Sequence, residues 1–96
     1  MEKQDGAVEG RSATGELLYE RAWRKGKPHG TWREYGQNGQ LASESVYEDG
    51  VRQGKWRTWY AGGQLRSEGS YQDGVEAGAW VAWHENGKPS FEAHYL

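Results

Sequence analysis

The sequence predicts an all-β fold, a single elongated antiparallel β-meander of stacked hairpins. Three observations support this prediction. A unit of 24 residues recurs along the chain, each unit contains two glycine-bearing turn signals, and stretches of about eight residues separate the turns. A fixed repeat of this length is typical of architectures that stack one supersecondary unit on copies of itself.

The repeat is defined by eight columns of residues that recur at steps of 24. About three and a half copies fit into residues 15–96, and the first copy lacks its tryptophan strand. Residues 1–14 are predicted to form a polar N-terminal tail, because they belong to none of the columns. The columns are Gly30/Gly54/Gly78, Trp32/Trp56/Trp80, Gly15/Gly39/Gly63/Gly87, Gly26/Gly50/Gly74, Leu17/Leu41/Leu65, Glu20/Glu44/Glu68/Glu92, Trp23/Tyr47/Tyr71/Tyr95 and Tyr35/Trp59/Trp83.

Composition bounds the class of protein. Only 34% of the 96 residues are hydrophobic, but six Trp and six Tyr can supply the apolar area that aliphatic residues do not. The net charge of -2 does not favour nucleic acid as a partner, and no apolar run reaches the roughly 18 residues of a membrane span. There is no cysteine, so redox chemistry does not indicate the compartment. The first residues contain no apolar signal-peptide core, and we therefore expect a cytoplasmic protein.

Two series of turns join the predicted strands. Asn38-Gly39 belongs to one series and Asp49-Gly50 to the other, and both pairs suit two-residue type I′ turns. Loops of this length fix the register of the strands. They place Arg33 opposite Glu44, Arg57 opposite Glu68 and Trp59 opposite Arg66, whereas Val81 leaves Glu92 without an arginine. We expect six or seven strands in all.

The same register divides the side chains between two faces. A β-bulge at the column of Gly30 would disturb this division. One face is predicted to carry Trp32, Leu41, Tyr47, Trp56, Tyr60, Leu65, Tyr71 and Trp80, and the other Tyr35, Trp59 and Trp83 with Arg33, Arg57, Glu44 and Glu68.

The motif G-x-W-x-x-[YW]…N-G-x-L-x-x-E-x-x-Y-x-D-G resembles the MORN-repeat variant. The best copies are residues 30–50 and 54–74, and a partial copy begins at Gly78. The resemblance implies an elongated meander with no catalytic residues. It also implies protein binding or a structural role, with links to lipids in some members. Bacterial proteins made mostly of this variant are commonly grouped as antitoxins or immunity proteins.

Catalytic, metal and cofactor sites are not predicted. His29, His84 and His94 are scattered over different repeat positions, and only His84 and His94 are candidates to meet across the last hairpin. A metal site needs three or four converging ligands. The recurring glutamates face arginines and are best explained as structural pairs. We therefore expect a protein that is not an enzyme and binds no cofactor.

The predicted partner-binding surface combines aromatic and charged residues. Contiguous exposed aromatic area often marks an interaction site, and Trp, Tyr and Arg dominate binding hot spots. The simpler alternative is that the rings stabilise the sheet or close a homodimer. Arg52, Tyr60, His84 and Glu85 are further candidates because they vary between repeats. The predicted residues are Arg33, Tyr35, Arg57, Trp59, Arg66 and Trp83.

Two functions remain open from the sequence. The first is an antitoxin or immunity protein that occludes a cognate toxin with a sheet face or with the edge of the last strand, residues 89–96. The second is a structural scaffold or self-assembling protein whose partner is another copy of itself or a membrane-associated complex. The two differ in oligomeric state, since only the second requires concentration-dependent self-association.

Overall fold

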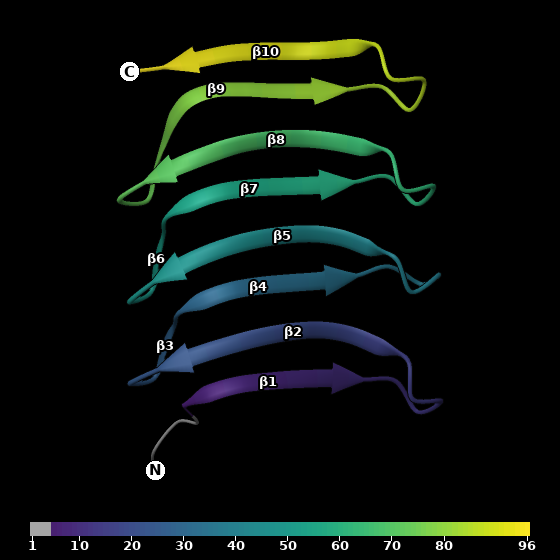
Figure 1. The fold of residues 1–96 in the computed structure, drawn as a ribbon, viewed down its shortest axis with the longest axis vertical. Helices are drawn as coiled ribbons and strands as arrows, with labels where there is room; N and C mark the ends of the chain where they lie inside the picture. Colours follow the sequence, from purple (N-terminus) through teal and green to yellow (C-terminus); the bar gives the residue numbers. More distant parts are fainter. Residues whose placement is uncertain (1–4) are drawn as a thin grey trace.

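The computed structural model describes residues 5–96 as one open antiparallel sheet. The chain runs back and forth across the sheet, so that sequence neighbours are also neighbours in space and the two ends lie at opposite edges (Figure 1). All-β meander architecture is thus confirmed. The strands are β1 Gly6–Arg11, β2 Leu17–Arg24, β3 Lys27–Pro28, β4 Gly30–Tyr35, β5 Leu41–Glu48, β6 Val51–Arg52, β7 Gly54–Trp59, β8 Leu65–Gln72, β9 Val75–Trp83 and β10 Pro89–Tyr95.

The prediction of a polar N-terminal tail is wrong for residues 6–11. Residues 6–11 form β1, which pairs with β2 from Gly6↔Trp23 to Arg11↔Leu17. Gly6 lies 24 residues before Gly30 and shares its positive φ (95° and 88°). Val8 stands where the other units have tryptophan, which hid this strand from the motif. The described residues therefore form four hairpins from ten strands, more than the six or seven strands predicted. Residues 1–4 of the predicted tail lie outside the described part.

The two-residue turns all lie on one side of the sheet, where β2, β5 and β8 end. Asp49 and Gly50 have φ values of 50° and 86°, and Asp73 and Gly74 have 53° and 83°. Both central residues of a type I′ turn need positive φ, which aspartate tolerates and glycine adopts freely. The predicted Asp-Gly turns are confirmed.

On the opposite side of the sheet, the strands are joined by loops of three residues, whereas loops of two residues were predicted. Gly36 N–H donates to the carbonyl of Gln40 at 2.8 Å, and Gly39 N–H donates to the carbonyl of Gly36 at 3.0 Å. This is a type I turn followed by a glycine with φ 81°. Asn-Gly suits both loop types, so the pair alone does not determine loop length.

A β-bulge beside each loop absorbs the extra residue. Glu34 pairs with Ser43 and Tyr35 pairs with Leu41, so Ala42 is left over. The bulge restores the predicted register in the body of the hairpin, where Arg33 does face Glu44. Bulged residues recur at the same step of 24: Leu18, Ala42, Arg66 and Ser90.

Gly30 and Gly54 of the glycine column interrupt their strands, whereas β9 continues through Gly78, and the faces are preserved. Tyr47 pairs with Arg52, whereas Glu44, three residues earlier on β5, pairs with Arg57, five residues further on. Two extra residues are therefore accommodated near Gly54, whose φ is 88°. Because side chains alternate with a period of two, an offset of two leaves each on its original face.

The sheet is a single layer without a closed core. Its Cα atoms span 46 × 37 × 13 Å, and no hydrophobic side chain within residues 5–96 is fully buried. Most strand side chains are partly exposed. Stability must therefore come from contacts along each face between adjacent strands.

Candidate functional site

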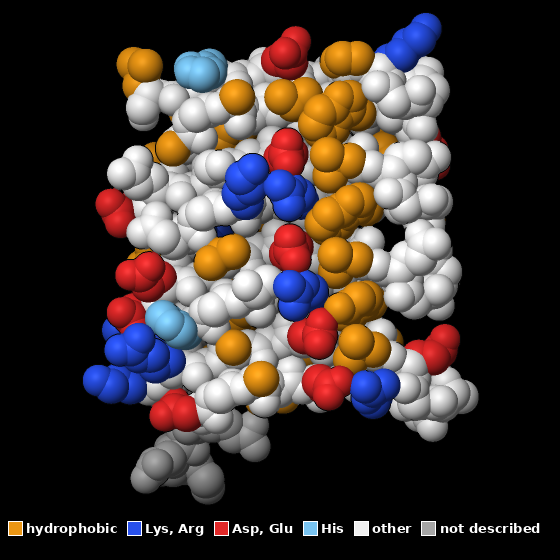
Figure 2. Space-filling model, viewed as in Figure 1, with side chains coloured by type: hydrophobic (Ala, Val, Ile, Leu, Met, Phe, Trp, Pro, Cys, Tyr) orange, Lys and Arg blue, Asp and Glu red, His pale blue; other side chains and the backbone are white. Residues whose placement is uncertain are grey.

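A row of charged residues crosses one face of the sheet, and we call it the charge ladder. Each member is the direct cross-strand partner of the next, and the row forms the central red and blue column of Figure 2. Signs alternate from Glu20 to Glu68, and Val81 interrupts the alternation. The ladder consists of Glu9, Glu20, Arg33, Glu44, Arg57, Glu68, Val81 and Glu92.

The ladder holds the predicted arginine–glutamate pairs. Arg33 Nε lies 2.9 Å from Glu44 Oε2, and Arg57 Nε lies 2.6 Å from Glu68 Oε2. The side chains of these four residues are 24% to 39% exposed. Cross-strand pairs of this kind contribute roughly 0.2–1 kcal/mol each. Glu92 lies opposite Val81, as predicted.

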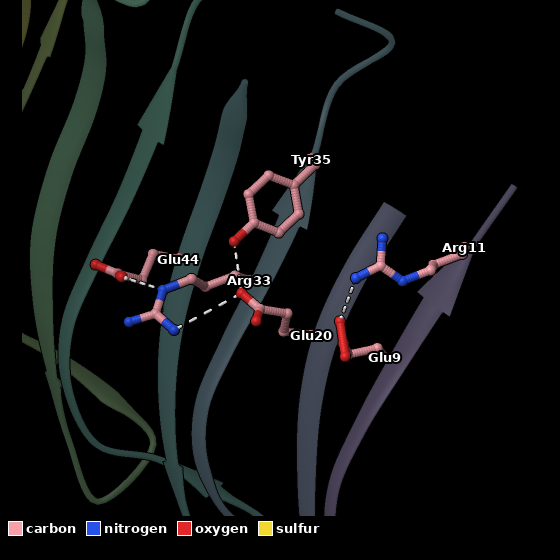
Figure 3. A network of polar contacts seen from close by, with 6 residues as sticks. All are labelled: Glu9, Arg11, Glu20, Arg33, Tyr35 and Glu44. Carbon is pink, nitrogen blue, oxygen red and sulfur yellow. Dashed lines mark hydrogen bonds and ion pairs between the residues drawn. The ribbon is translucent and has the colours of Figure 1, made fainter. Parts of the chain in front are cut away.

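Tyr35 adds an uncharged member to this network, as Figure 3 shows. Its hydroxyl donates a hydrogen bond of 2.5 Å to Glu20 Oε1, and Arg33 Nη1 approaches the same oxygen to 3.9 Å. The hydrogen bond to Glu20, followed by burial, raises the pKa of Tyr35 above its ordinary value of 10.0. The phenol is therefore held in its neutral form beside the carboxylate.

A band of apolar residues, which we call the aromatic stripe, runs beside the ladder on the same face. Tyr35 lies two positions after Arg33 and Trp59 two positions after Arg57, so each shares the face of its arginine. The band follows the ladder along the sheet (Figure 2). The stripe consists of Leu17, Tyr35, Leu41, Trp59, Leu65, Trp83 and Pro89.

Two leucines lie on the face opposite to the predicted one. Leu41 pairs with Tyr35 and Leu65 pairs with Trp59, so both belong to the stripe. The bulges move them there, because one extra residue reverses the alternation of side chains. The stripe is consequently continuous, because the leucines lie beside the predicted aromatic residues Tyr35, Trp59 and Trp83.

Arg66 is not placed where the sequence predicted it. The expectation that it faces Trp59 is wrong, because Arg66 is the bulged residue and Leu65 takes the position opposite Trp59. The Arg66 guanidinium lies instead 5.6 Å from the centre of the Tyr60 ring. Tyr60 follows the end of β7, and its hydroxyl donates a 2.6 Å hydrogen bond to the carbonyl of Trp83.

The second face carries most of the predicted tryptophan and tyrosine layer. Trp32 packs 5.3 Å from Tyr47, and Trp80 packs 5.1 Å from Tyr71, measured between ring centres. Two indole N–H groups donate to backbone carbonyls: Trp32 Nε1 to Ala22 at 2.9 Å and Trp80 Nε1 to Ser70 at 3.1 Å. These rings contact one another and thereby stabilise the sheet. The layer consists of Trp23, Trp32, Tyr47, Trp56, Tyr71, Trp80 and Tyr95.

Arg52 joins two hairpins within this layer. Its Nε donates to the Tyr47 hydroxyl at 3.2 Å and its Nη1 to the Tyr71 hydroxyl at 3.0 Å. The hydrogen bond with Tyr47 is the main cause that raises the pKa of Arg52. Arg52 is thus engaged within the aromatic layer, away from the ladder and stripe.

The histidines do not converge. His94 pairs with Ala79, whereas His84 lies beyond the other end of β9, so the last hairpin keeps them apart. His29 accepts a hydrogen bond from the backbone N–H of Asp49 at 3.2 Å. Within residues 5–96 no three residues of metal-ligand type are grouped, and no helix is long and apolar enough to cross a membrane.

The repeat matches a known family model over most of its length. The model of the MORN repeat variant matches residues 28–49, 52–73 and 77–96, which together make up two thirds of the chain. The chain belongs to the MORN repeat variant family. The three matched segments correspond to the hairpins β3/β4–β5, β6/β7–β8 and β9–β10. No curated protein matches the chain.

Membership in the MORN repeat variant family is compatible with a general class of role. MORN repeats are consistent with a protein-binding or structural repeat module, and MORN repeat proteins are generally non-enzymatic. The structure adds a fourth hairpin, β1–β2, which has the same connections although the family model does not cover it. The predicted binding residues lie within the matched segments, distributed over ladder, stripe and bulge.

Proposed function

We propose that the protein binds another protein through the face that carries the charge ladder and the aromatic stripe. The observation that carries this proposal is the continuity of the stripe over four hairpins beside a row of alternating charges. Partly exposed Trp and Tyr flanked by Arg have the composition of binding hot spots. The sheet spans 46 × 37 Å, so the area of one face is larger than the roughly 800 Å² that each partner buries in a standard interface.

The partner in this proposal is a bacterial toxin, and the protein is its antitoxin or immunity protein in the cytoplasm. Binding occludes the active surface of the toxin, so the chain itself requires no catalytic group and no cofactor. A hydrogen-bonded sheet is already ordered before it meets a partner, which lowers the entropic cost of binding. The residues proposed for contact are Arg33, Tyr35, Arg57, Trp59, Arg66 and Trp83.

A pull-down from the source cell with the tagged protein tests this function. We expect one stoichiometric partner that is toxic when expressed alone and harmless when co-expressed. A Trp59→Ala/Trp83→Ala variant, confirmed to be folded, should lose this partner. Phe91→Ala is the matched control, since Phe91 is 52% exposed but pairs with Ala82 on the other face. Retention of the partner by the double variant would exclude the stripe as the contact surface.

The second candidate function is self-assembly into a scaffold. In the described sheet β10 pairs with β9 alone, and its outer side carries backbone groups that suit strand addition. β10 also exposes Phe91 and Tyr95. If the protein captures only itself, and sedimentation shows oligomers that grow with concentration, this function replaces the toxin proposal.

A further inference from the structure

A cavity of about 410 Å³ lies between two neighbouring loops at the edge of the stripe. Its apolar wall is formed by Leu41 and Trp59, and Asn38 bridges the loops by donating a 2.7 Å hydrogen bond to the carbonyl of Ala61. Its volume is within the range of small-ligand sites. Its lining includes Gly36, Asn38, Leu41, Ala42, Trp59 and Tyr60.

The next gap along the sheet, one repeat further on, holds a side chain of the protein itself. Tyr60 occupies the repeat position of Gly36, and it extends to the following hairpin, where its hydroxyl bonds the carbonyl of Trp83. The guanidinium of Arg66 lies over its ring. This gap, between the loop after β7 and the loop after β9, is therefore bridged by a phenol ring with a polar anchor.

The cavity exists because the same two positions carry small residues one repeat earlier. Gly36 replaces Tyr60, and Ala42 replaces Arg66. The backbone is otherwise equivalent, since Gly36 N–H bonds Gln40 as Tyr60 N–H bonds Gln64, both at 2.8 Å. The wall residue Trp59 corresponds to Trp83 in the repeat. The carbonyl of Trp59 is therefore the counterpart of the Trp83 carbonyl that accepts the hydrogen bond from Tyr60.

We propose that this cavity is a socket for a phenol ring supplied in trans by a tyrosine side chain of a protein partner. The ring takes the place that Tyr60 fills in the next gap, packs on Trp59 and Leu41, and donates its hydroxyl to the carbonyl of Trp59. That the ring belongs to a protein partner rests on the proposed binding function. The affinity of the socket for phenols does not rest on it.

The socket is tested first with 4-methylphenol, the side-chain analogue of tyrosine, by amide chemical shifts of the labelled protein. We expect saturable shifts centred on the loop after Tyr35 and on residues 59–61, with a dissociation constant on the order of 1 mM. The ether 4-methylanisole has the ring but no donor, and it should bind about fivefold more weakly, which corresponds to one hydrogen bond.

Gly36→Tyr fills the socket in cis and should abolish these shifts. Gly36 has no positive φ, and an added Cβ would lie 3.4 Å from Asn38 Oδ1, so a side chain is compatible with the backbone. Gly36→Ala is the matched control, since it stiffens the backbone but leaves the socket open and should still bind. Ala42→Arg provides a second way to fill the cavity if Gly36→Tyr does not fold.

Equal binding of 4-methylphenol by wild type and filled variants, or shifts centred elsewhere, would overturn the proposal. A protein partner captured by the wild type should bind Gly36→Tyr about thirtyfold more weakly, as expected when a hot-spot residue is excluded. Undiminished binding of that partner would overturn the use of the socket by the partner but leave the proposed function standing. If 4-methylphenol binds but the pull-down captures no protein partner, the proposed function is overturned and the socket for a phenol ring still stands.

Discussion

Tyr35 links adjacent hairpins through one polar contact. It belongs to β4, but its hydroxyl donates to Glu20 on β2, and Glu20 is also the ladder neighbour of Arg33. The first hairpin places Glu9 opposite Glu20, so Glu20 lacks the arginine that its counterparts Glu44 and Glu68 have within their own hairpins. Tyr35 and Arg33 compensate for this from the next hairpin.

The contribution of Tyr35 to stability should depend on alkaline pH. Because its pKa is raised in the folded state, the neutral phenol stabilises the fold fully below the unfolded pKa of about 10 and this stabilisation is lost as pH rises through the folded pKa. Tyr35→Phe should cost about 1 kcal/mol at pH 7, and the difference from wild type should shrink above about pH 10. Urea unfolding followed by tryptophan fluorescence at pH 7, 9 and 11 measures it.

Glu20→Gln is the control for this effect, because it removes the carboxylate that keeps the phenol neutral. In that background the effect of Tyr35→Phe should depend less on pH. A difference between wild type and Tyr35→Phe that stays constant from pH 9 to 11 would contradict the role of this hydrogen bond.

Val81 marks a gap in the charge ladder that a single substitution should close. It lies between Glu68 and Glu92, where the two preceding hairpins have arginine. Val81→Arg should stabilise the protein by about 0.5 kcal/mol, and the gain should disappear in 1 M salt because exposed charges are screened. Val81→Gln, which adds polarity without charge, should show no such salt dependence in chemical denaturation. A gain that persists in high salt would point to packing instead of charge.

The pairing of charged residues was predictable, whereas the position of Arg66 was not. Arg33–Glu44 and Arg57–Glu68 follow from the turn spacing, and so does the unpaired Glu92. The sequence contains no direct sign of the bulge that moves Arg66 out of line with Trp59. The candidate socket had a visible signal, since Gly36 stands in the column of Tyr60, but only the folded chain shows that the column spans a gap.

The loops and turns set the geometry of each hairpin. A three-residue loop shifts the pairing by one residue, and the bulge beside it shifts the pairing back. These two errors cancel in a prediction based on two-residue loops, which is why the arginine–glutamate pairs were correct while Leu41 and Leu65 were assigned to the wrong face. Strand β2 follows from the repeat columns, but β1 does not, because Val8 stands in the tryptophan column; Gly6 continues the glycine column.

Substitution of Gly54 should weaken the sheet. Its φ of 88° is disfavoured for residues with a Cβ, while the added atom itself would find ordinary space, 3.8 Å from Val46. Gly54→Ala should therefore cost roughly 1–2 kcal/mol through backbone strain alone. Thermal and urea unfolding measure the loss, and an unchanged stability would show that the strand break does not require a left-handed residue.

Gly62 should respond in the opposite direction. It has no positive φ, and the corresponding loops carry Asn38 and Asn86, whose side chains accept a hydrogen bond from the backbone two residues on. Gly62→Asn should stabilise the protein by roughly 0.5–1 kcal/mol, because it restricts the unfolded chain and adds this contact. The same unfolding experiment decides, and destabilisation would mean that the added side chain clashes with Gln64, which an added Cβ would approach.

At the scale of the molecule, each hairpin contacts only its immediate neighbours. The extensive contacts all join strands that are adjacent in the sheet, and residues 5–96 form no closed core that draws on every unit. Stability in such a protein is approximately a sum of unit and interface terms. The order of the hairpins is therefore less important than an intact 24-residue step.

Deletion of residues 52–75 should leave a folded protein of three hairpins. It joins Val51 to Glu76, which occupies the repeat position of Arg52. The denaturant dependence of unfolding should fall by roughly a quarter, since it scales with the surface exposed. Deletion of residues 53–64 is the control. It removes one strand, reverses the direction of those that follow, and should abolish cooperative unfolding. Loss of folding in the longer deletion would contradict the local origin of stability.

The 24-residue step also has a consequence for a partner that lies across the sheet. Strands are about 4.8 Å apart, so the ladder and stripe present nearly the same pattern at increments of roughly 10 Å. A partner that contacts only the periodic features can therefore bind at several offsets of similar energy. Gly36, Ala42 and Val81 break the translational symmetry, and the socket beside Trp59 occurs in one gap and not in the next. Such singular positions select one offset from an otherwise degenerate set.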